Sequence, residues 1–143
     1  MTYVDKDGTE KTPVVLHRAI LGSLDRFMAY LIEETKGIFP VWLAPLQVKL
    51  LCLPNTDTTF AKELYEKLHY ARVRVKLDDR NQTIGSKILQ ARKFDRLPYM
   101  FIIGAKEIET HTLSVRELVT DKTTEYSVDE FIAKITDEIK NRK

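Results

Sequence analysis

The stretch QVKLLCLP, residues 47–54, is almost continuously apolar and constrains the fold more than any other part of the 143-residue chain. A strand with one face in water alternates apolar and polar residues, whereas a strand covered by helices on both faces is apolar throughout. Segments with strand and helix patterns alternate from here to the C-terminus. This order predicts an α/β sandwich of three layers, with helices on both faces of a mixed, mostly parallel sheet of about five strands.

Apolar residues recur at intervals of three and four, as in amphipathic helices, in four segments. These helices are expected over residues 19–36, 58–71 and 84–94, and from Ser127 onward. Ser127 and Glu130 form a capping box at the start of the last one. Three further strands are expected over residues 72–78, 99–104 and 111–118, with Glu107 in a turn before the third.

The N-terminal part of the chain has a different pattern. Residues 3–16 predict a hairpin, with DKDG as its turn and the apolar stretch PVVLH after Pro13 in its second strand. Further on, Pro40 and Pro45 bracket Trp42 in the rigid connector GIFPVWLAP. We therefore expect two parts, residues 1–38 and 39–143.

Several classes of protein are excluded or disfavoured. No apolar run approaches the roughly 18 residues of a membrane span. Met1 is followed by polar residues and not by a basic and then apolar segment, which predicts no secretory signal and a cytoplasmic location. Cys52, the single cysteine, is expected to be a buried small hydrophobe and not a reactive thiol. No glycine-rich phosphate loop follows a strand, which argues against a nucleotide-binding α/β enzyme.

Basic residues are concentrated between residues 72 and 96, where eight Lys or Arg accompany three acids. The rest of the chain is mildly acidic, because the net charge of the whole is only +2. A local basic block of this kind is typical of a surface that faces a polyanion, although plain solvated faces also carry such blocks.

Five blocks of the sequence together resemble the threonyl-tRNA synthetase family. They are PVVLHRAILGSLDRF, FPVWLAPLQV, VRVKLDDRNQTIGSKI, LPYMFIIGAKEIE and LSVRE, and the resemblance covers residues 3 to about 142. It implies that residues 1–38 are the end of a class II catalytic domain, with its third signature motif. It also implies that residues 39–143 are an anticodon-binding domain with the fold of that family.

The resemblance assigns three residues to the catalytic part of the parent enzyme. Arg26 corresponds to an arginine that contacts ATP, His17 to a zinc ligand, and Ser23 to the floor of the same substrate site. The remaining zinc ligands, a cysteine and a histidine, are expected upstream of residue 1, since His69 and His111 lie in the other part. We therefore expect ATP with Mg²⁺ and one Zn²⁺ in a homodimeric parent ligase, and no cofactor or ligase activity in this chain.

The resemblance also implies that Asn81, Glu107 and Arg116 contact bases in the anticodon loop of tRNA(Thr). A carboxylate accepts hydrogen bonds from base amino or imino groups, and an arginine can donate to two acceptors at once. Without the resemblance, Asn81 could instead form an Asx turn, and Glu107 and Arg116 a cross-strand ion pair.

Four cations are expected to contact phosphates: Arg80, Lys87, Arg92 and Lys93. They could also belong to an ordinary solvated face. Between Gly85 and Pro98 the chain is one residue longer than the common bacterial pattern. The alternative function is a stand-alone RNA- or protein-binding adapter with the same fold.

Overall fold

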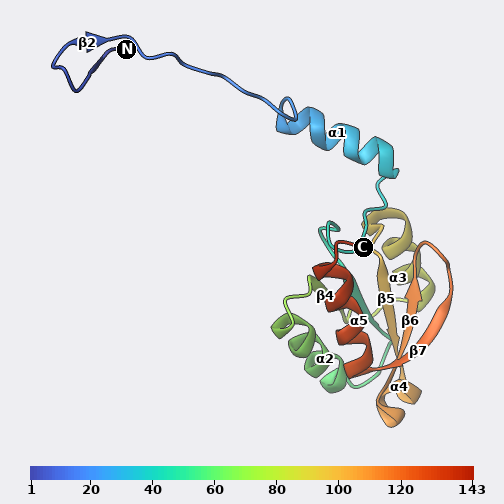
Figure 1. Cartoon of the computed structure of the whole chain (residues 1–143). Helices are drawn as coiled ribbons and strands as arrows, with labels where there is room; N and C mark the ends of the chain where they lie inside the picture. Colours follow the sequence, from blue (N-terminus) through green and yellow to red (C-terminus); the bar gives the residue numbers. More distant parts are fainter.

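The structure, a computed structural model, describes all 143 residues and shows an arm, residues 1–37, that projects from a body, residues 38–143 (Figure 1). The arm contains the short strands β1 (Tyr3–Val4) and β2 (Glu10–Lys11) and one helix, α1 (Leu24–Thr35). No α1 residue is buried. None of the helices has the length and apolar character that a membrane crossing requires.

A five-stranded sheet forms the centre of the body. Its strands lie in the order β4 (Val75–Asp78), β3 (Val48–Cys52), β5 (Tyr99–Ile103), β6 (Thr112–Glu117) and β7 (Thr123–Ser127). β3 pairs in parallel with β4 and β5, while β6 pairs antiparallel with β5 and β7. Four strands therefore run in one direction and β6 runs against them, which confirms the predicted mixed, mostly parallel sheet.

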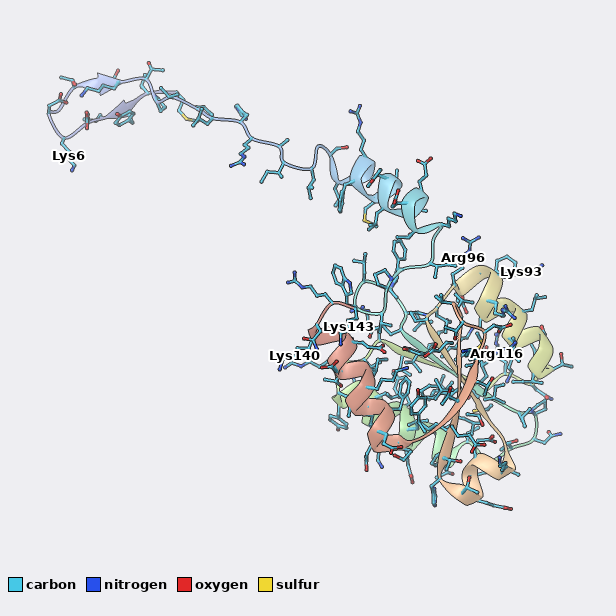
Figure 2. All side chains as sticks on the ribbon, turned by 45° about the vertical axis from the view of Figure 1, so that its right-hand side comes forward. Lys6, Lys93, Arg96, Arg116, Lys140 and Lys143 are labelled. Carbon is cyan, nitrogen blue, oxygen red and sulfur yellow. The ribbon has the colours of Figure 1, made fainter.

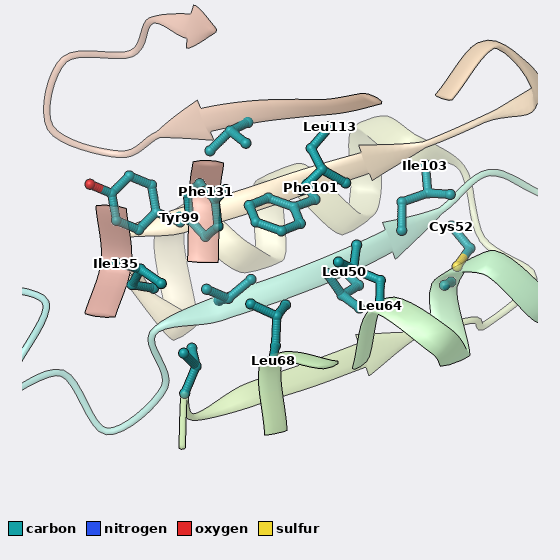
Figure 3. Close-up of a cluster of buried hydrophobic side chains, with 14 residues drawn as sticks. Leu50, Cys52, Leu64, Leu68, Tyr99, Phe101, Ile103, Leu113, Phe131 and Ile135 are labelled. Atoms are coloured by element: carbon teal, nitrogen blue, oxygen red, sulfur yellow. The ribbon is translucent and has the colours of Figure 1, made fainter. Parts of the chain in front are cut away.

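Helices cover both faces of the sheet, as predicted. On one face, α2 (Thr59–Tyr70) and α5 (Val128–Lys140) bury Leu64, Leu68 and Phe131 against the main apolar core (Figure 3). The rings of Phe101 and Phe131 meet edge to face, with their centroids 4.7 Å apart. On the other face, α3 (Ile84–Gln90) and the π-helical turn η1 (Ala91–Asp95) cover a smaller core. All five residues of β3 are buried, because β3 lies between these two layers.

The connector between arm and body is fastened to the start of β4. The buried Gln47 amide donates to the Val41 carbonyl at 2.7 Å and accepts from the Arg74 backbone N–H at 2.9 Å. The Arg74 guanidinium in turn donates to the carbonyls of Ala44 and Trp42. These contacts hold the connector against the sheet.

Two predictions for the arm are wrong. The second hairpin strand is Glu10–Lys11, and the segment PVVLH has no strand partner. The helix begins at Leu24 and not at residue 19, because Gly22 has a φ of 72° and Ser23 caps the helix by accepting from the Arg26 N–H. The apolar spacing continues upstream of Ser23, so the pattern alone predicted a helix that is too long.

Two elements of the body were not predicted. The segment around Glu107 is a short helix, α4 (Ala105–Thr110), and not a turn. The strand β7 (Thr123–Ser127) is polar and mostly exposed at the edge of the sheet, so it has no apolar run to mark it.

Candidate functional site

The residues predicted to contact bases lie on three separate elements. Asn81 lies in the loop between β4 and α3, and Glu107 lies in the first turn of α4, which follows β5. Both therefore lie beyond the carboxyl ends of parallel strands, where α/β folds commonly bind ligands. Arg116 lies on β6, three strand spacings or about 14 Å across the sheet from β4.

Glu107 is held in place by two hydrogen bonds. Its Oε2 atom accepts from the Gly104 backbone N–H at 3.0 Å, and its Oε1 atom accepts from the Ser114 hydroxyl at 2.8 Å. Burial by itself would raise the pKa of the Glu107 carboxyl, but the hydrogen bonds from Ser114 and the backbone outweigh it and lower the pKa below its usual value. Glu107 is therefore a fixed and charged acceptor at neutral pH.

Ser114 and Arg116 point to the same face of β6, because they are two residues apart on one strand. No ion pair joins Glu107 to Arg116, so the cross-strand alternative is wrong. The Arg116 guanidinium instead donates to one oxygen of Asp121, at 2.9 Å from Nε and 2.8 Å from Nη2. Ser114 thus lies between a fixed carboxylate and a fixed guanidinium.

Asp121 also brings Arg116 close to the helical layer. The same Oδ1 atom of Asp121 lies 3.4 Å from an Nη atom of Arg92, which is on η1. Two guanidinium groups from different elements therefore converge on one partly exposed carboxylate. Because only one negative charge faces two positive ones, the cluster remains cationic.

Lys87 does not lie where a phosphate contact requires it. Its side chain is fully buried, and its ammonium donates to the Cys52 carbonyl at 2.7 Å and to the Asp78 carbonyl at 3.1 Å. A lysine in this position cannot reach an RNA backbone. The prediction for Lys87 is therefore corrected to a structural role, in which it joins α3 to the ends of β3 and β4.

The buried charge of Lys87 is balanced within a network centred on Asp78. The Asp78 carboxylate accepts from the Arg80 guanidinium at 2.8 and 2.5 Å and lies 3.6 Å from the Lys49 ammonium. The hydrogen bonds from Arg80 lower the pKa of Asp78 to about 2. Arg80 also donates to the Gln90 side chain at 2.8 Å, so it braces β4 against α3.

The loop that carries Asn81 begins at this brace. Asn81 is exposed, and its side chain makes no hydrogen bond, so the structure contains no Asx turn at this position. Its amide is free to accept from and donate to a ligand. Arg80, one residue earlier, is occupied by its partners but keeps 46% of its side chain exposed.

The turn η1 lies between Gly85 and Pro98, in the segment that the resemblance predicts to be one residue longer than the family pattern. Single π-helical turns within α-helices are rare and are frequent at functional sites. Arg92 and Lys93 lie within this widened turn, and Lys93 is exposed.

The arm holds the remaining predicted residues, and they are not brought together into a site. His17 is exposed in a segment without regular structure, Ser23 caps α1, and Arg26 is exposed in its first turn. No group of three or more His, Cys, Asp or Glu side chains could hold a metal ion. His69 and His111 belong to the body, so the residues present do not fit the zinc site that the resemblance implies.

Two residues of the site were missed in the sequence. Ser114 could have been found, since it precedes Arg116 by two and must share its face of the strand. Asp121 carries no such signal, because it lies in the turn before a strand that the pattern did not predict.

Comparisons with known proteins identify the family to which the body belongs. The family model described as "Anticodon binding domain" matches residues 42–138, which is most of the body. The whole chain is 40% identical over 144 residues to a threonine–tRNA ligase of Oceanobacillus iheyensis and covers 22% of it. A threonine–tRNA ligase of Clostridium botulinum is 42% identical over 99% of the chain, which again covers 22% of the relative. The chain thus spans about a fifth of the curated relatives it matches.

Solved structures give the same result. The RNA binding domain of threonyl-tRNA synthetase from Cryptosporidium parvum is 31% identical, with a TM-score of 0.77 over 92% of this chain and 33% of that chain. A prolyl-tRNA synthetase from the same organism has a TM-score of 0.63 and 27% identity over 72% of this chain and 23% of its own. The likeness to both is consistent with the predicted fold class.

Proposed function

Because the chain belongs to the anticodon binding domain family, we propose that its body reads the anticodon loop of a threonine tRNA. The observation that carries the proposal is the pair of side chains held on either side of Ser114. Glu107 is a fixed anionic acceptor, and Arg116 is a guanidinium whose present partner, Asp121, a base can replace. Bases in a single-stranded loop expose their hydrogen-bonding edges to such groups.

Each side chain suits a different part of a base. The Glu107 carboxylate accepts from amino or imino groups, since its lowered pKa keeps it ionised. The Arg116 guanidinium donates to ring nitrogen and carbonyl acceptors once it exchanges Asp121 for a base. The unpaired Asn81 amide, across the sheet, can both donate and accept. Arg92 and Lys93 serve as phosphate contacts, and Arg80 contributes charge without leaving Asp78.

We further propose that the body functions within a longer cytoplasmic threonine–tRNA ligase. That enzyme would attach threonine to tRNA(Thr) with ATP and Mg²⁺, in a homodimer, and a zinc ion would select threonine in its catalytic part. Residues 1–38 would be the end of that catalytic part, so Arg26, Ser23 and His17 would act only when completed by the rest. Residues on α1 such as Leu24, which is 74% exposed, would be covered there.

Binding to an anticodon stem-loop tests the proposal. Affinity for the threonine-tRNA hairpin is compared with affinity for the same hairpin with its second and third anticodon bases changed, at two salt concentrations. The native loop is expected to bind more tightly, and Arg116→Ala is expected to remove about 1–3 kcal/mol of that preference. Equal binding of both loops, with a steep loss at high salt, would mean that the body contacts phosphates only.

A further inference from the structure

A shallow hollow lies where the arm joins the body. It has a volume of about 650 Å³ and seven lining residues, of which four are cationic and none is acidic. The cations are Lys36, Arg92, Lys93 and Arg96, and the apolar residues are Ile38, Phe94 and Leu118. Figure 2 shows Lys93 and Arg96 near the end of α1 and well away from Lys140 on α5.

The positive charge of the hollow is only partly neutralised. No carboxylate lies within ion-pair distance of Lys36 or Lys93, and Arg96 donates to the Lys36 carbonyl. Asp95 lies between the hollow's residues in sequence, but its carboxylate accepts from the buried Lys49 ammonium at 2.5 Å. The one acid that pairs with a lining cation, Asp121, is shared by Arg92 and Arg116. The hollow therefore attracts anions.

Phe94 adds an aromatic surface among these cations. It is 79% exposed, although it belongs to the widened turn η1, whose Ala91 packs into the smaller core. A single exposed aromatic ring is ordinary on its own. An exposed ring beside several cations without acids is the arrangement by which proteins bind single-stranded nucleic acid, since bases stack on the ring and phosphates meet the cations.

We propose that this hollow is a second RNA contact, in which Phe94 stacks on an unpaired base and Lys93 and Arg96 contact the adjacent phosphates without regard to sequence. The inference rests on the proposed function, which supplies RNA as the partner. The hollow is continuous with the proposed base-reading site, because Arg92 lines it and joins Arg116 through Asp121. A bound RNA loop would thus extend from Arg116 toward the base of the arm.

Three variants of the full chain separate this contact from base reading. Phe94→Ala, Lys93→Ala and the control Lys140→Ala are measured against both the native and the base-changed hairpin over a range of salt concentrations. Lys140 is a suitable control because it is exposed, has no ion-pair partner, and lies on the opposite helical layer. Melting curves confirm that each variant is folded, which is expected since all three side chains are exposed.

Phe94→Ala is expected to weaken both hairpins about 5- to 150-fold and to leave the salt dependence unchanged. Lys93→Ala is expected to weaken both and to lower the slope of log affinity against log salt by about 1. In each case the ratio between the two hairpins should stay constant, and Lys140→Ala should change neither quantity. If the native chain binds both hairpins with equal affinity, the proposed base reading is wrong. The effects of Phe94→Ala and Lys93→Ala on affinity can still be measured in that case.

Native RNA affinity in both Phe94→Ala and Lys93→Ala would overturn the second contact, and a protein occupant of the hollow would give that result. An equal effect of Lys140→Ala and Lys93→Ala would also overturn it, because the effect would then come from net charge and not from this hollow.

Discussion

Replacing Lys87 by methionine tests whether the basic block of the sequence divides into buried and RNA-facing cations. Methionine keeps most of the volume of the side chain but removes the donor to the carbonyls of Cys52 and Asp78. A buried polar group that loses its partner costs about 1–3 kcal/mol. Loss of a positive charge beside the buried Asp78 carboxylate adds to this, while removal of a buried ammonium returns part of its desolvation cost.

The net expectation for Lys87→Met is a loss of about 3 kcal/mol from the free energy of unfolding, out of the roughly 5–15 kcal/mol typical of a domain. Urea unfolding followed by circular dichroism measures it. Lys93→Ala is the matched control on the same helical segment, and its stability should stay within about 0.5 kcal/mol of the native value because Lys93 is exposed.

In RNA binding the order is reversed: the substitution of Lys93 should have an effect, and that of Lys87 should have none. At a low urea concentration and low temperature, where Lys87→Met is still folded, the salt slope of hairpin binding should be native for Lys87→Met and reduced by about 1 for Lys93→Ala. A Lys87→Met protein with both native stability and a reduced salt slope would show that Lys87 faces solvent and the RNA.

Three further outcomes are expected. The pKa of Asp78 is lowered from 3.8 to about 2 in the folded chain. Its contribution of about 2 kcal/mol to the free energy of unfolding is therefore present above pH 4 and is lost as the pH falls toward 2. Acid titration of the urea midpoint should show this loss, and Asp78→Asn should abolish the pH dependence. Ser114→Ala removes the hydroxyl that fixes Glu107, so the ratio of affinities for the native and base-changed hairpins should fall about threefold or more, with no change in the salt slope. An unchanged ratio would show that Ser114 does not position Glu107 for the base. Asp121→Asn leaves Arg116 and Arg92 without their shared anion, so both hairpins should bind more tightly at low salt; weaker binding would mean that Asp121 orients Arg116 for the base.

The parts of the fold with strong apolar periodicity could be predicted from the sequence. The continuous run in β3 indicated a strand covered on both faces, and the capping box of Ser127 and Glu130 marked the start of α5. The edge strand β7 could not be predicted in the same way, since a half-solvated edge does not require apolar residues. In the arm, apolar spacing continued across Gly22, where the backbone leaves the helical region.

Some residues of the candidate site could be predicted from the sequence and others could not. Asn81, Glu107 and Arg116 were predicted as base contacts through the family resemblance, and the structure adds hydrogen-bond partners for Glu107 and Arg116 only. Burial of Lys49 and Lys87 was not predictable from composition, because charged residues are seldom buried unless they are paired. Their partner, Asp78, lies far from Lys49 in the sequence, so only the parallel register of β3 and β4 brings the two together.

A double-mutant cycle measures base reading most directly. The protein is changed at Arg116→Ala, the hairpin at its second or third anticodon base, and the affinity of all four combinations is compared. If Arg116 reads one of these bases, its loss and the base change should be strongly non-additive, with a coupling of about 1–3 kcal/mol at that base and little at the other. Additive effects at both bases would show that Arg116 contacts only the backbone, and the account of this surface as an anticodon reader would then be wrong.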